Sequence, residues 1–268
     1  MREFAAIITG DEVLNCTVND ENGFWLCNGM NSLGFFTREI IFLRDDIYSI
    51  SSHIKRLISS GIDIIIITGG LGPTYDDMTL RAIAKATDRS LKINKQALEM
   101  VKERYEFLYE NGIVKEKSMN RYREKMAILP EGSIPIRNPN GAAPGIMIKE
   151  KGTLIFALPG VPSEMKRMFD EEVKAIIEKE LGIWAYNEKH IFLDHRDEST
   201  IAEILEEISK RHDVYIKSRA GIINNEKKMV ITLASRAENE EEAREKIKGA
   251  MDELYHLLKE KNIQFHDH

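Results

Sequence analysis

The chain is poor in cysteine, and its two thiols, Cys16 and Cys27, fit neither a zinc site nor a redox pair by their spacing. Its seven histidines are scattered and lack zinc-type spacing as well. These scarcities argue against a zinc centre and against a disulfide framework. We therefore expect free thiols, a cytoplasmic location, and oxygen ligands for any metal that binds.

Long apolar runs are also missing, and so is a large excess of one charge. No stretch approaches the roughly 18 apolar residues needed to span a bilayer, so we expect no membrane association. The first residues enter a strand pattern at once, which leaves no room for a signal peptide. A net charge of -6 argues against broad nucleic-acid binding. With 268 residues, 43% hydrophobic and 31% charged, the composition is that of a globular protein with one large and one small domain.

The most informative segment runs from residue 64 to residue 77. Four consecutive isoleucines without polar alternation predict a strand buried on both faces of a parallel sheet. The glycines Gly69, Gly70 and Gly72 let the backbone turn and approach a ligand closely, and a helical pattern begins beyond Pro73. In an open α/β sheet, phosphates and nucleotides bind at this kind of connection.

Two aspartates make this loop unusual. Asp76 and Asp77 would repel a phosphate unless a divalent cation lay between them, which predicts a nucleotide-type site with a metal. A purely structural alternative is that Thr74 and Asp77 form a capping box at the start of a helix. The loop is not a Walker loop, since no Gly-Lys-Ser/Thr follows, nor a Rossmann fingerprint, since the third glycine is absent.

The order of the predicted elements indicates the fold class. Strands are expected at 4–8, 35–43 and 62–68, with helices at 22–33 and 47–59 between them. Such a βαβαβ run requires right-handed crossovers and a mostly parallel sheet. We then expect a helix to residue 87, a charged helical stretch at 95–125 broken near Asn111-Gly112, a loop-rich section at 130–145, and strands at 146–148 and 154–158.

Basic residues follow one another in the charged stretch, among them Arg121, Arg123 and Lys125. They are candidates for contact with an anionic ligand, but a solvated helix face is the favoured interpretation. After residue 158, a second strand-to-helix connection resembles the glycine loop in position. Ser163 is placed to cap the long helix that follows it. Two such loops facing one crevice make a stronger site than either alone.

A domain boundary is expected near Leu181-Gly182, which gives a first domain of residues 1–181 and a second of 182–268. The second part shows strand patterns at 190–193, 214–218 and 228–234 and helical patterns at 199–210 and 240–259. It is predicted to be a small α+β module. Its turn near 218–221 is not the glycine clamp of an RNA-binding KH domain, so a structural or dimerising role is favoured over RNA binding.

Four motifs along residues 3–180 resemble the CinA (competence/damage-inducible protein) family. They are Gly10-Asp11-Glu12-Val13-Leu14 with Asn22; Gly69-Gly70-Leu71-Gly72-Pro73-Thr74-x-Asp76-Asp77-x-Thr79; Asn138-Pro139-x-Gly141-x-Ala143-Pro144-Gly145; and Leu158-Pro159-Gly160-x-Pro162-Ser163-Glu164-Met165. The resemblance implies a three-layer α/β/α domain of the MoaB/MogA-like molybdopterin-binding fold, followed by a KH-type module. It also implies a homodimer.

The resemblance further implies an activity, the hydrolysis of ADP-ribose to AMP and ribose 5-phosphate. The cofactors implied are a divalent cation (Mg, Mn or Co) and potassium. The deamidase domain that many relatives carry at their C-terminus is expected to be absent. Two departures are noted: Cys16 stands where the family usually has glycine, and Met126 where it has glutamine.

The resemblance assigns roles to particular residues. Asp77, Asp76 and Asp45 are the implied metal ligands and catalytic groups, and the amides of Gly69, Gly70 and Gly72 are the implied phosphate cradle. The hydroxyls of Thr68 and Thr74 are implied to donate to phosphate. The other implied substrate-binding residues are Gly10, Glu12, Asn22, Asn138, Gly141, Ala143, Gly145, Pro159, Gly160, Ser163 and Glu164. For Glu12 a surface role, and for Ser163 and Glu164 a helix-capping role, stand as alternatives.

Two other functions fit the same motifs. One is molybdopterin binding or nucleotidyl transfer in molybdenum cofactor metabolism, since that group shares the glycine loop and the aspartate. The other is a non-catalytic module that binds a nucleotide and acts through its second domain. The substrate would in each case be a small nucleotide or pterin.

Overall fold

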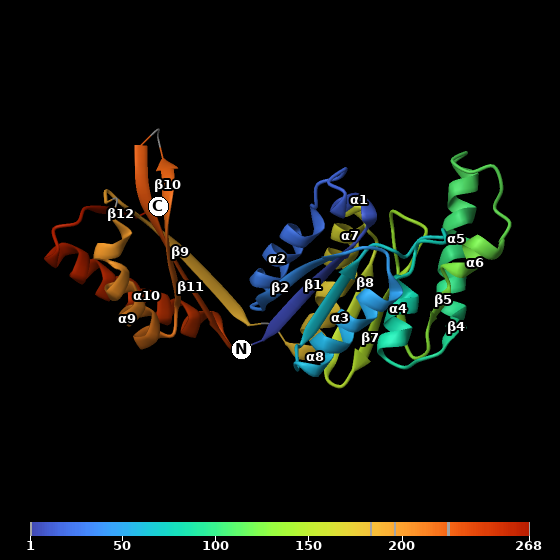
Figure 1. Ribbon diagram of the computed structural model, residues 1–268, viewed down its shortest axis with the longest axis horizontal. Coiled ribbons are helices and arrows are strands. Elements are labelled where there is room, and N and C mark those ends of the chain that lie inside the picture. Colours follow the sequence, from blue (N-terminus) through green and yellow to red (C-terminus); the bar gives the residue numbers. More distant parts are fainter. Residues whose placement is uncertain (1, 183, 196, 224–225, 268) are drawn as a thin grey trace. The chain divides into compact units, whose positions relative to one another are not determined.

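The computed structural model describes residues 2–182, 184–195, 197–223 and 226–267 (Figure 1). The chain forms two compact units. The first comprises Met1–Asn31 and Phe35–Gly182, and the second comprises Ser32–Gly34 and Ile183–His268. Each unit has its own sheet and its own core.

The first unit is built on a six-stranded sheet in the order β2-β1-β3-β8-β7-β6. Its strands are β1 (Glu3–Thr9), β2 (Phe36–Leu43), β3 (Ile64–Thr68), β6 (Ile134–Ile136), β7 (Gly145–Glu150) and β8 (Thr153–Leu158). β2, β1, β3 and β8 pair in parallel, whereas β7 and β6 are antiparallel additions at one edge. The predicted βαβαβ run and mostly parallel sheet are confirmed.

The isoleucine run occupies the middle of this sheet. Every residue of Ile64–Thr68 is buried, and β3 is hydrogen-bonded to β1 on one side and to β8 on the other. A strand with a neighbour on each side and helices on each face has no solvent-exposed position, which explains why the sequence shows no polar alternation.

Helices cover both faces of the sheet (Figure 1). On one face, α3 (Ile47–Ser59) and α4 (Thr79–Ala86) share a hydrophobic core with side chains of β1, β3 and β8. The remaining helices of the unit's core are α2 (Asn22–Ser32), α7 (Pro162–Met168), the π-helical turn η1 (Phe169–Val173) and α8 (Lys174–Leu181). The rings of Trp25 and Phe169 meet edge to face at 5.3 Å, so α2 packs against η1. The three-layer α/β/α fold is confirmed.

A helical arm, residues 91–130, extends the first unit. It contains β4 (Leu91–Ile93), α5 (Lys95–Glu110), α6 (Arg121–Lys125) and β5 (Ile128–Pro130), with β4 and β5 paired antiparallel. The predicted break is confirmed, because Asn111 caps α5 and Gly112 follows with a φ of 69°. A further short helix, α1 (Asp11–Leu14), follows β1.

The prediction that Ser163 caps the helix that follows β8 is wrong. α7 begins at Pro162, with Val161 as the preceding N-cap residue and no side-chain cap bond. Proline suits the first helical position because its fixed φ is helical and its missing N–H needs no partner there. Ser163 therefore lies inside the helix.

The second unit is an α+β module. It contains β9 (Ala185–Leu193), the 3-10 turn η2 (Glu198–Thr200), α9 (Ala202–His212), β10 (Tyr215–Ile223), β11 (Glu226–Ala237), α10 (Glu240–Glu260) and β12 (Phe265–Asp267). Its sheet, in the order β10-β11-β9-β12, has antiparallel pairings. α9 and α10 bury a core that includes Leu205, Ile208 and Leu254 against Ile231 and Leu233.

Candidate functional site

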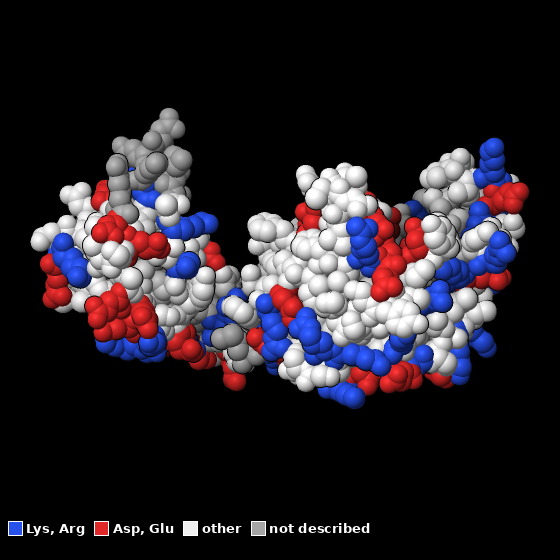
Figure 2. Space-filling model, viewed as in Figure 1, with Lys and Arg blue, Asp and Glu red and all other residues white. Residues whose placement is uncertain are grey.

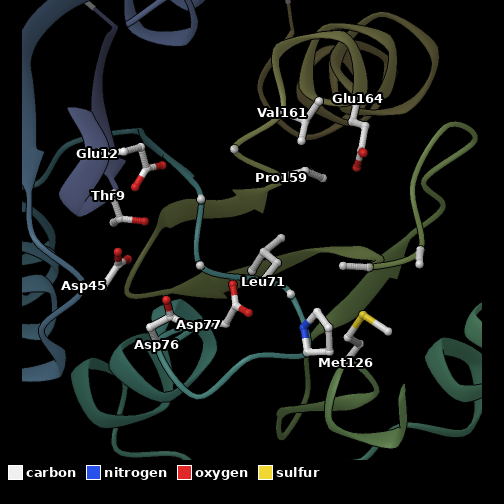
Figure 3. A pocket seen from close by; sticks show the side chains of 18 of the residues that line it. Thr9, Glu12, Asp45, Leu71, Asp76, Asp77, Met126, Pro159, Val161 and Glu164 are labelled. Atoms are coloured by element: carbon white, nitrogen blue, oxygen red, sulfur yellow. The ribbon is translucent and has the colours of Figure 1, made fainter. Parts of the chain in front are cut away.

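A pocket of about 410 Å³ lies at the carboxyl ends of the four parallel strands of the first unit (Figure 3). Thr9 and Gly10 come from the end of β1, Asp45 follows β2, residues 69–73 follow β3, and residues 159–161 follow β8. Figure 2 shows acidic side chains exposed at this edge of the unit. The strand order reverses at this edge, because β2 lies on one side of β1 and β3 lies on the other. Ligands of open α/β sheets bind at such a reversal.

The glycine–aspartate loop, residues 69–77, begins in close contact with the backbone at the end of β1. Gly69 and Gly70 have φ values of 100° and 66°, which favour glycine. A Cβ on Gly69 would lie 2.4 Å from the carbonyl oxygen of Thr9, so no side chain fits there. The Gly69 amide donates to the Leu158 carbonyl at 3.0 Å. That bond removes the Gly69 N–H from the expected phosphate cradle.

Carboxylates dominate the polar lining. Glu12, Asp45, Asp76, Asp77 and Glu164 line the pocket, and within the described part of the chain no lysine, arginine or histidine joins them there. Partial burial raises the pKa of Asp45, and repulsion from Glu12, Asp11 and Asp76 raises it further, although a hydrogen bond from the Asp11 amide opposes the shift. Figure 3 shows the side chains of Glu12, Asp45 and Asp76 directed toward a common space on one side of the loop.

Asp77 has a structural task within the loop. Its Oδ2 accepts hydrogen bonds from the Thr74 amide at 2.7 Å and the Thr74 hydroxyl at 2.6 Å. Thr74 and Asp77, which the sequence also offered as a helix-capping pair, therefore close a turn within the loop. They do not cap α4, because this helix begins only at Thr79. The Thr74 hydroxyl is already donated to Asp77 and does not line the pocket, contrary to its expected contact with phosphate.

The three aspartates are not gathered into one metal cluster. Among the residues that the structure describes, no three His, Cys, Asp or Glu side chains form a group able to hold a metal ion. One reason is that Asp77 directs its Oδ2 at Thr74. The metal itself stays a prediction.

Lys125 holds the loop from outside. Its ammonium group donates to the carbonyl oxygens of Gly72 at 3.2 Å and Asp77 at 3.0 Å, and also to that of Thr74. Burial lowers the pKa of Lys125, whereas Asp77 and Asp76 favour its charged form. This residue is therefore neither a free ligand contact nor part of a solvated face, the two roles weighed from the sequence.

Asn138 organises the opposite wall of the pocket. Its Nδ2 donates to Glu164 Oε2 at 2.7 Å and to the Ala143 carbonyl at 3.0 Å, while its Oδ1 accepts from the amides of Asn140 and Gly141. A Cβ on Gly141 would lie 1.9 Å from Glu164 Oε2, so any larger residue there would displace this carboxylate. Glu164 thus lines the pocket, held by Asn138, and makes no helix cap.

Most residues expected at the site line this pocket. They are Gly10, Glu12, Asp45, Gly69, Gly70, Gly72, Asp76, Asp77, Ala143, Pro159, Gly160 and Glu164. The expected residues that do not line it are Asn22, Thr68, Thr74, Asn138, Gly141, Gly145 and Ser163.

Some of the residues outside the pocket still shape it. Asn22 is buried and its Nδ2 donates to the Gly160 carbonyl at 2.8 Å, which ties α2 to the second loop. The side chain of Thr68 is fully buried at the end of β3, so its expected contact with phosphate is wrong. Thr9, on the adjacent strand, lines the pocket in its place.

Sequence reasoning missed seven lining residues as site members: Thr9, Leu71, Pro73, Tyr105, Met126, Ala142 and Val161. Thr9 had a usable signal, because it ends a strand directly before the Gly10 motif. Met126 had a signal in the resemblance, as a position where that family usually has glutamine, whereas Tyr105 had none, since it comes from the helical arm, whose pattern indicates only a charged helix. Together with Val161 and Pro159 they add apolar groups to the lining of the pocket.

A family model described as "Probable molybdopterin binding domain" matches residues 5–179. The chain belongs to this family. The molybdopterin-binding-type domain includes every strand of the six-stranded sheet and both loops of the pocket, apart from the first residues of β1.

Individual relatives extend this picture. A protein from Pyrococcus furiosus is 42% identical over 216 residues, which cover 80% of this chain and 84% of that protein. A protein from Sulfurisphaera tokodaii is 38% identical over 253 residues, 94% of this chain and 93% of its own. The crystal structure of the protein CinA "with unknown function" from Thermoplasma acidophilum superposes with a TM-score of 0.59 at 31% identity, over 65% of this chain and 99% of that one.

These comparisons support the expected MoaB/MogA-like fold of the molybdopterin-binding-type domain. The Sulfurisphaera relative shows that both units occur together in another protein. Within the described residues, no helix is long and apolar enough to cross a membrane.

Proposed function

We propose that the pocket binds a phosphorylated nucleotide or pterin together with a divalent cation, and that it hydrolyses a diphosphate linkage, with ADP-ribose as the substrate to test first. One observation carries the proposal: five carboxylates line the pocket without a basic side chain among its described lining residues. A diphosphate would be repelled by such a lining unless a cation accompanied it.

The donor set fits a hard cation. Carboxylate oxygens are the protein ligands that Mg²⁺ and Mn²⁺ prefer, and Mg²⁺ commonly takes only one or two of them beside phosphate oxygens and water. Asp45 and Asp76 would supply these ligands, since their side chains face the same space. When bound, the cation would neutralise charge on the diphosphate oxygens.

The chain's own groups would divide the remaining work. Asp45 would either hold the cation or accept a proton from the attacking water, the two roles that the resemblance gives this carboxylate. The amides after Gly69 would bind phosphate oxygens beside the N-terminal end of α4. The apolar lining residues, among them Tyr105, Met126 and Val161, would contact the ring of the ligand.

A second candidate is binding of a molybdopterin-type ligand without hydrolysis. The family match favours it, because the model that covers residues 5–179 is described as a probable molybdopterin-binding domain. We propose a CinA-type assignment on the four motifs together with the similarity to the CinA protein from Thermoplasma acidophilum. That similarity does not distinguish hydrolysis from binding, because that protein is described as one with unknown function. The two candidates share the pocket and differ in whether the diphosphate is cleaved.

The deciding experiment is AMP release from ADP-ribose by the purified chain, with magnesium, manganese or cobalt added. We expect metal-dependent AMP formation that falls by roughly 10²–10⁴-fold in Asp45→Asn. Asp77→Asn is a weaker probe, because it also removes the charge that closes the turn onto Thr74.

Asp170→Asn is the matched control, since Asp170 is an exposed carboxylate on η1 away from the pocket. Its activity should equal that of the unmodified chain. If no metal supports AMP release while a reduced pterin binds with an affinity that Asp45→Asn weakens, the second candidate replaces the first.

A further inference from the structure

Three backbone carbonyl oxygens of the glycine–aspartate loop converge on one ammonium group. The oxygens belong to Gly72, Thr74 and Asp77, and the group is that of Lys125 at the end of α6. A lysine ammonium has three N–H donors, so all three are used within this one loop. The side chain reaches the loop from the helical arm, more than forty residues further along the chain.

Carbonyl oxygens arranged in this way also bind monovalent metal ions. In potassium-selective sites, backbone carbonyls replace the water shell of K⁺, and the ammonium ion is of nearly the same size and charge. The ammonium of lysine is likewise a compact point charge. The neighbouring carboxylates of Asp76 and Asp77 add negative potential, which favours a cation at this position.

We propose that Lys125 is a positioning residue that supplies, as part of the chain, the monovalent cation that the carbonyl oxygens of the loop bind. It holds residues 72–77 in the shape that presents Asp76 to the pocket and turns Asp77 toward Thr74. A chain that lacks this ammonium should bind K⁺ in its place. The inference concerns the loop's structure and holds whichever reaction the pocket performs.

The test compares Lys125→Met with the unmodified chain in chloride salts of potassium, ammonium, sodium and tetramethylammonium at one ionic strength of about 0.15 M. Thermal unfolding reports the whole chain, and amide hydrogen exchange of peptides covering residues 72–77 reports the loop. In tetramethylammonium we expect Lys125→Met to unfold roughly 4–8 °C lower and its loop amides to exchange about tenfold faster.

Potassium and ammonium should restore at least half of both losses in Lys125→Met, and tetramethylammonium none. Lys102→Met is the matched control, because Lys102 lies on the same arm in a salt bridge with Glu99 at 3.6 Å. It should show no selective response to potassium. Lys125→Arg should retain part of the protection without potassium, since its guanidinium keeps the charge and several donors.

Equal behaviour of Lys125→Met in all four salts would overturn the inference, as would the same response in Lys102→Met. If Lys125→Met does not fold, hydrogen exchange of the unmodified chain in the same salts still tests the inference. Its loop amides should be equally protected in potassium and tetramethylammonium, and selective protection by potassium would mean that the carbonyls still bind an external ion.

Discussion

At the scale of single residues, Cys16 has a backbone conformation that normally belongs to glycine. Its φ is 57°, and its side chain is exposed in the loop after α1. A residue with a Cβ in this left-handed region costs roughly 1–2 kcal/mol. The glycine that the CinA resemblance implies at this position would avoid that cost.

Cys16→Gly should therefore stabilise the protein. The relief of strain is reduced by the greater freedom of glycine in the unfolded chain, roughly 0.5–1 kcal/mol, which leaves a gain of up to about 1.5 kcal/mol. Urea unfolding measures it. Cys16→Ala is the control, because it removes the thiol but keeps the Cβ, and an equal gain in both variants would show that the thiol was responsible.

Asp45 links the chemistry of the pocket to stability. Burial and neighbouring carboxylates raise its pKa in the folded state, so the folded chain binds more protons than the unfolded chain between the ordinary and the raised pKa. Unfolding free energy then falls as pH rises through that window. The negative charge of Asp45, which suits a metal-binding or proton-accepting role, thus lowers the free energy of unfolding.

Asp45→Asn should accordingly be more stable than the unmodified chain at neutral pH, and the difference should disappear below about pH 3.9, where an ordinary aspartate is protonated. Thermal unfolding across pH 3–8 checks this sign. Should the variant be less stable at neutral pH, Asp45 has a favourable structural partner that outweighs repulsion. Gain of stability with loss of turnover would mark a functional carboxylate.

At the scale of elements, α3 depends on a single side-chain cap. Asp46 precedes the helix in an extended conformation, and its Oδ2 accepts from the Ser49 amide at 2.6 Å. The helix then buries Ile50, Ile54 and Leu57 against the sheet. A cap at this point fixes where the helix begins and hence which of its residues meet the core.

Asp46→Ala should cost about 1 kcal/mol of unfolding free energy, because one amide at the helix start loses its partner. Asp46→Asn should cost much less, since its amide oxygen accepts the same bond. Chemical denaturation of the pair measures the difference. Equal losses in both variants would assign the effect to charge at the helix end instead of the hydrogen bond.

The elements that could be predicted from the sequence are those with a long and regular pattern. The isoleucine run of β3 and the helical periodicity of α3 identified the centre of the sheet and one of its covering helices. β4, β5, β6 and β12 each have only three residues, too few for periodicity to appear. Their pairing depends on strands elsewhere in the chain.

The site likewise has parts that the sequence predicts and parts that it does not. The glycine loop and the second loop were predictable because glycine and proline mark sharp connections after strands. The contacts of Lys125 and Asn138 were not, since each joins segments far apart in sequence through a side chain whose direction only tertiary packing determines. Thr68 and Thr9 each end a strand at the pocket, and the burial of the Thr68 side chain beneath the lining is set by tertiary packing.

At the scale of the whole molecule, the two units have separate hydrophobic cores. Ile54 is buried in the first and Ile231 in the second, both completely. Chains with more than one such core often do not unfold in a single step. The stability of the pocket is then a property of the first unit.

Ile231→Ala and Ile54→Ala should each cost roughly 2–5 kcal/mol, but in different units. Calorimetry combined with hydrogen exchange should show Ile231→Ala lowering the transition of residues 183–268 while the amides around the pocket keep their protection. Ile54→Ala should do the reverse. A uniform loss of protection in both variants would show that the units unfold as one.

The pocket draws its walls from the ends of β1, β2, β3 and β8, and this has a consequence for the time at which it can exist. Residues 159–164 follow β8, whose pairing with β3 places Leu154 opposite Ile64 and brings the second loop beside the glycine loop. A nascent chain that has left the ribosome only as far as β7 therefore has the acidic loop but no pocket. Pairings between segments so distant in sequence form slowly. Recovery of ligand binding during refolding should thus lag behind the appearance of helix, and binding reports the completed sheet.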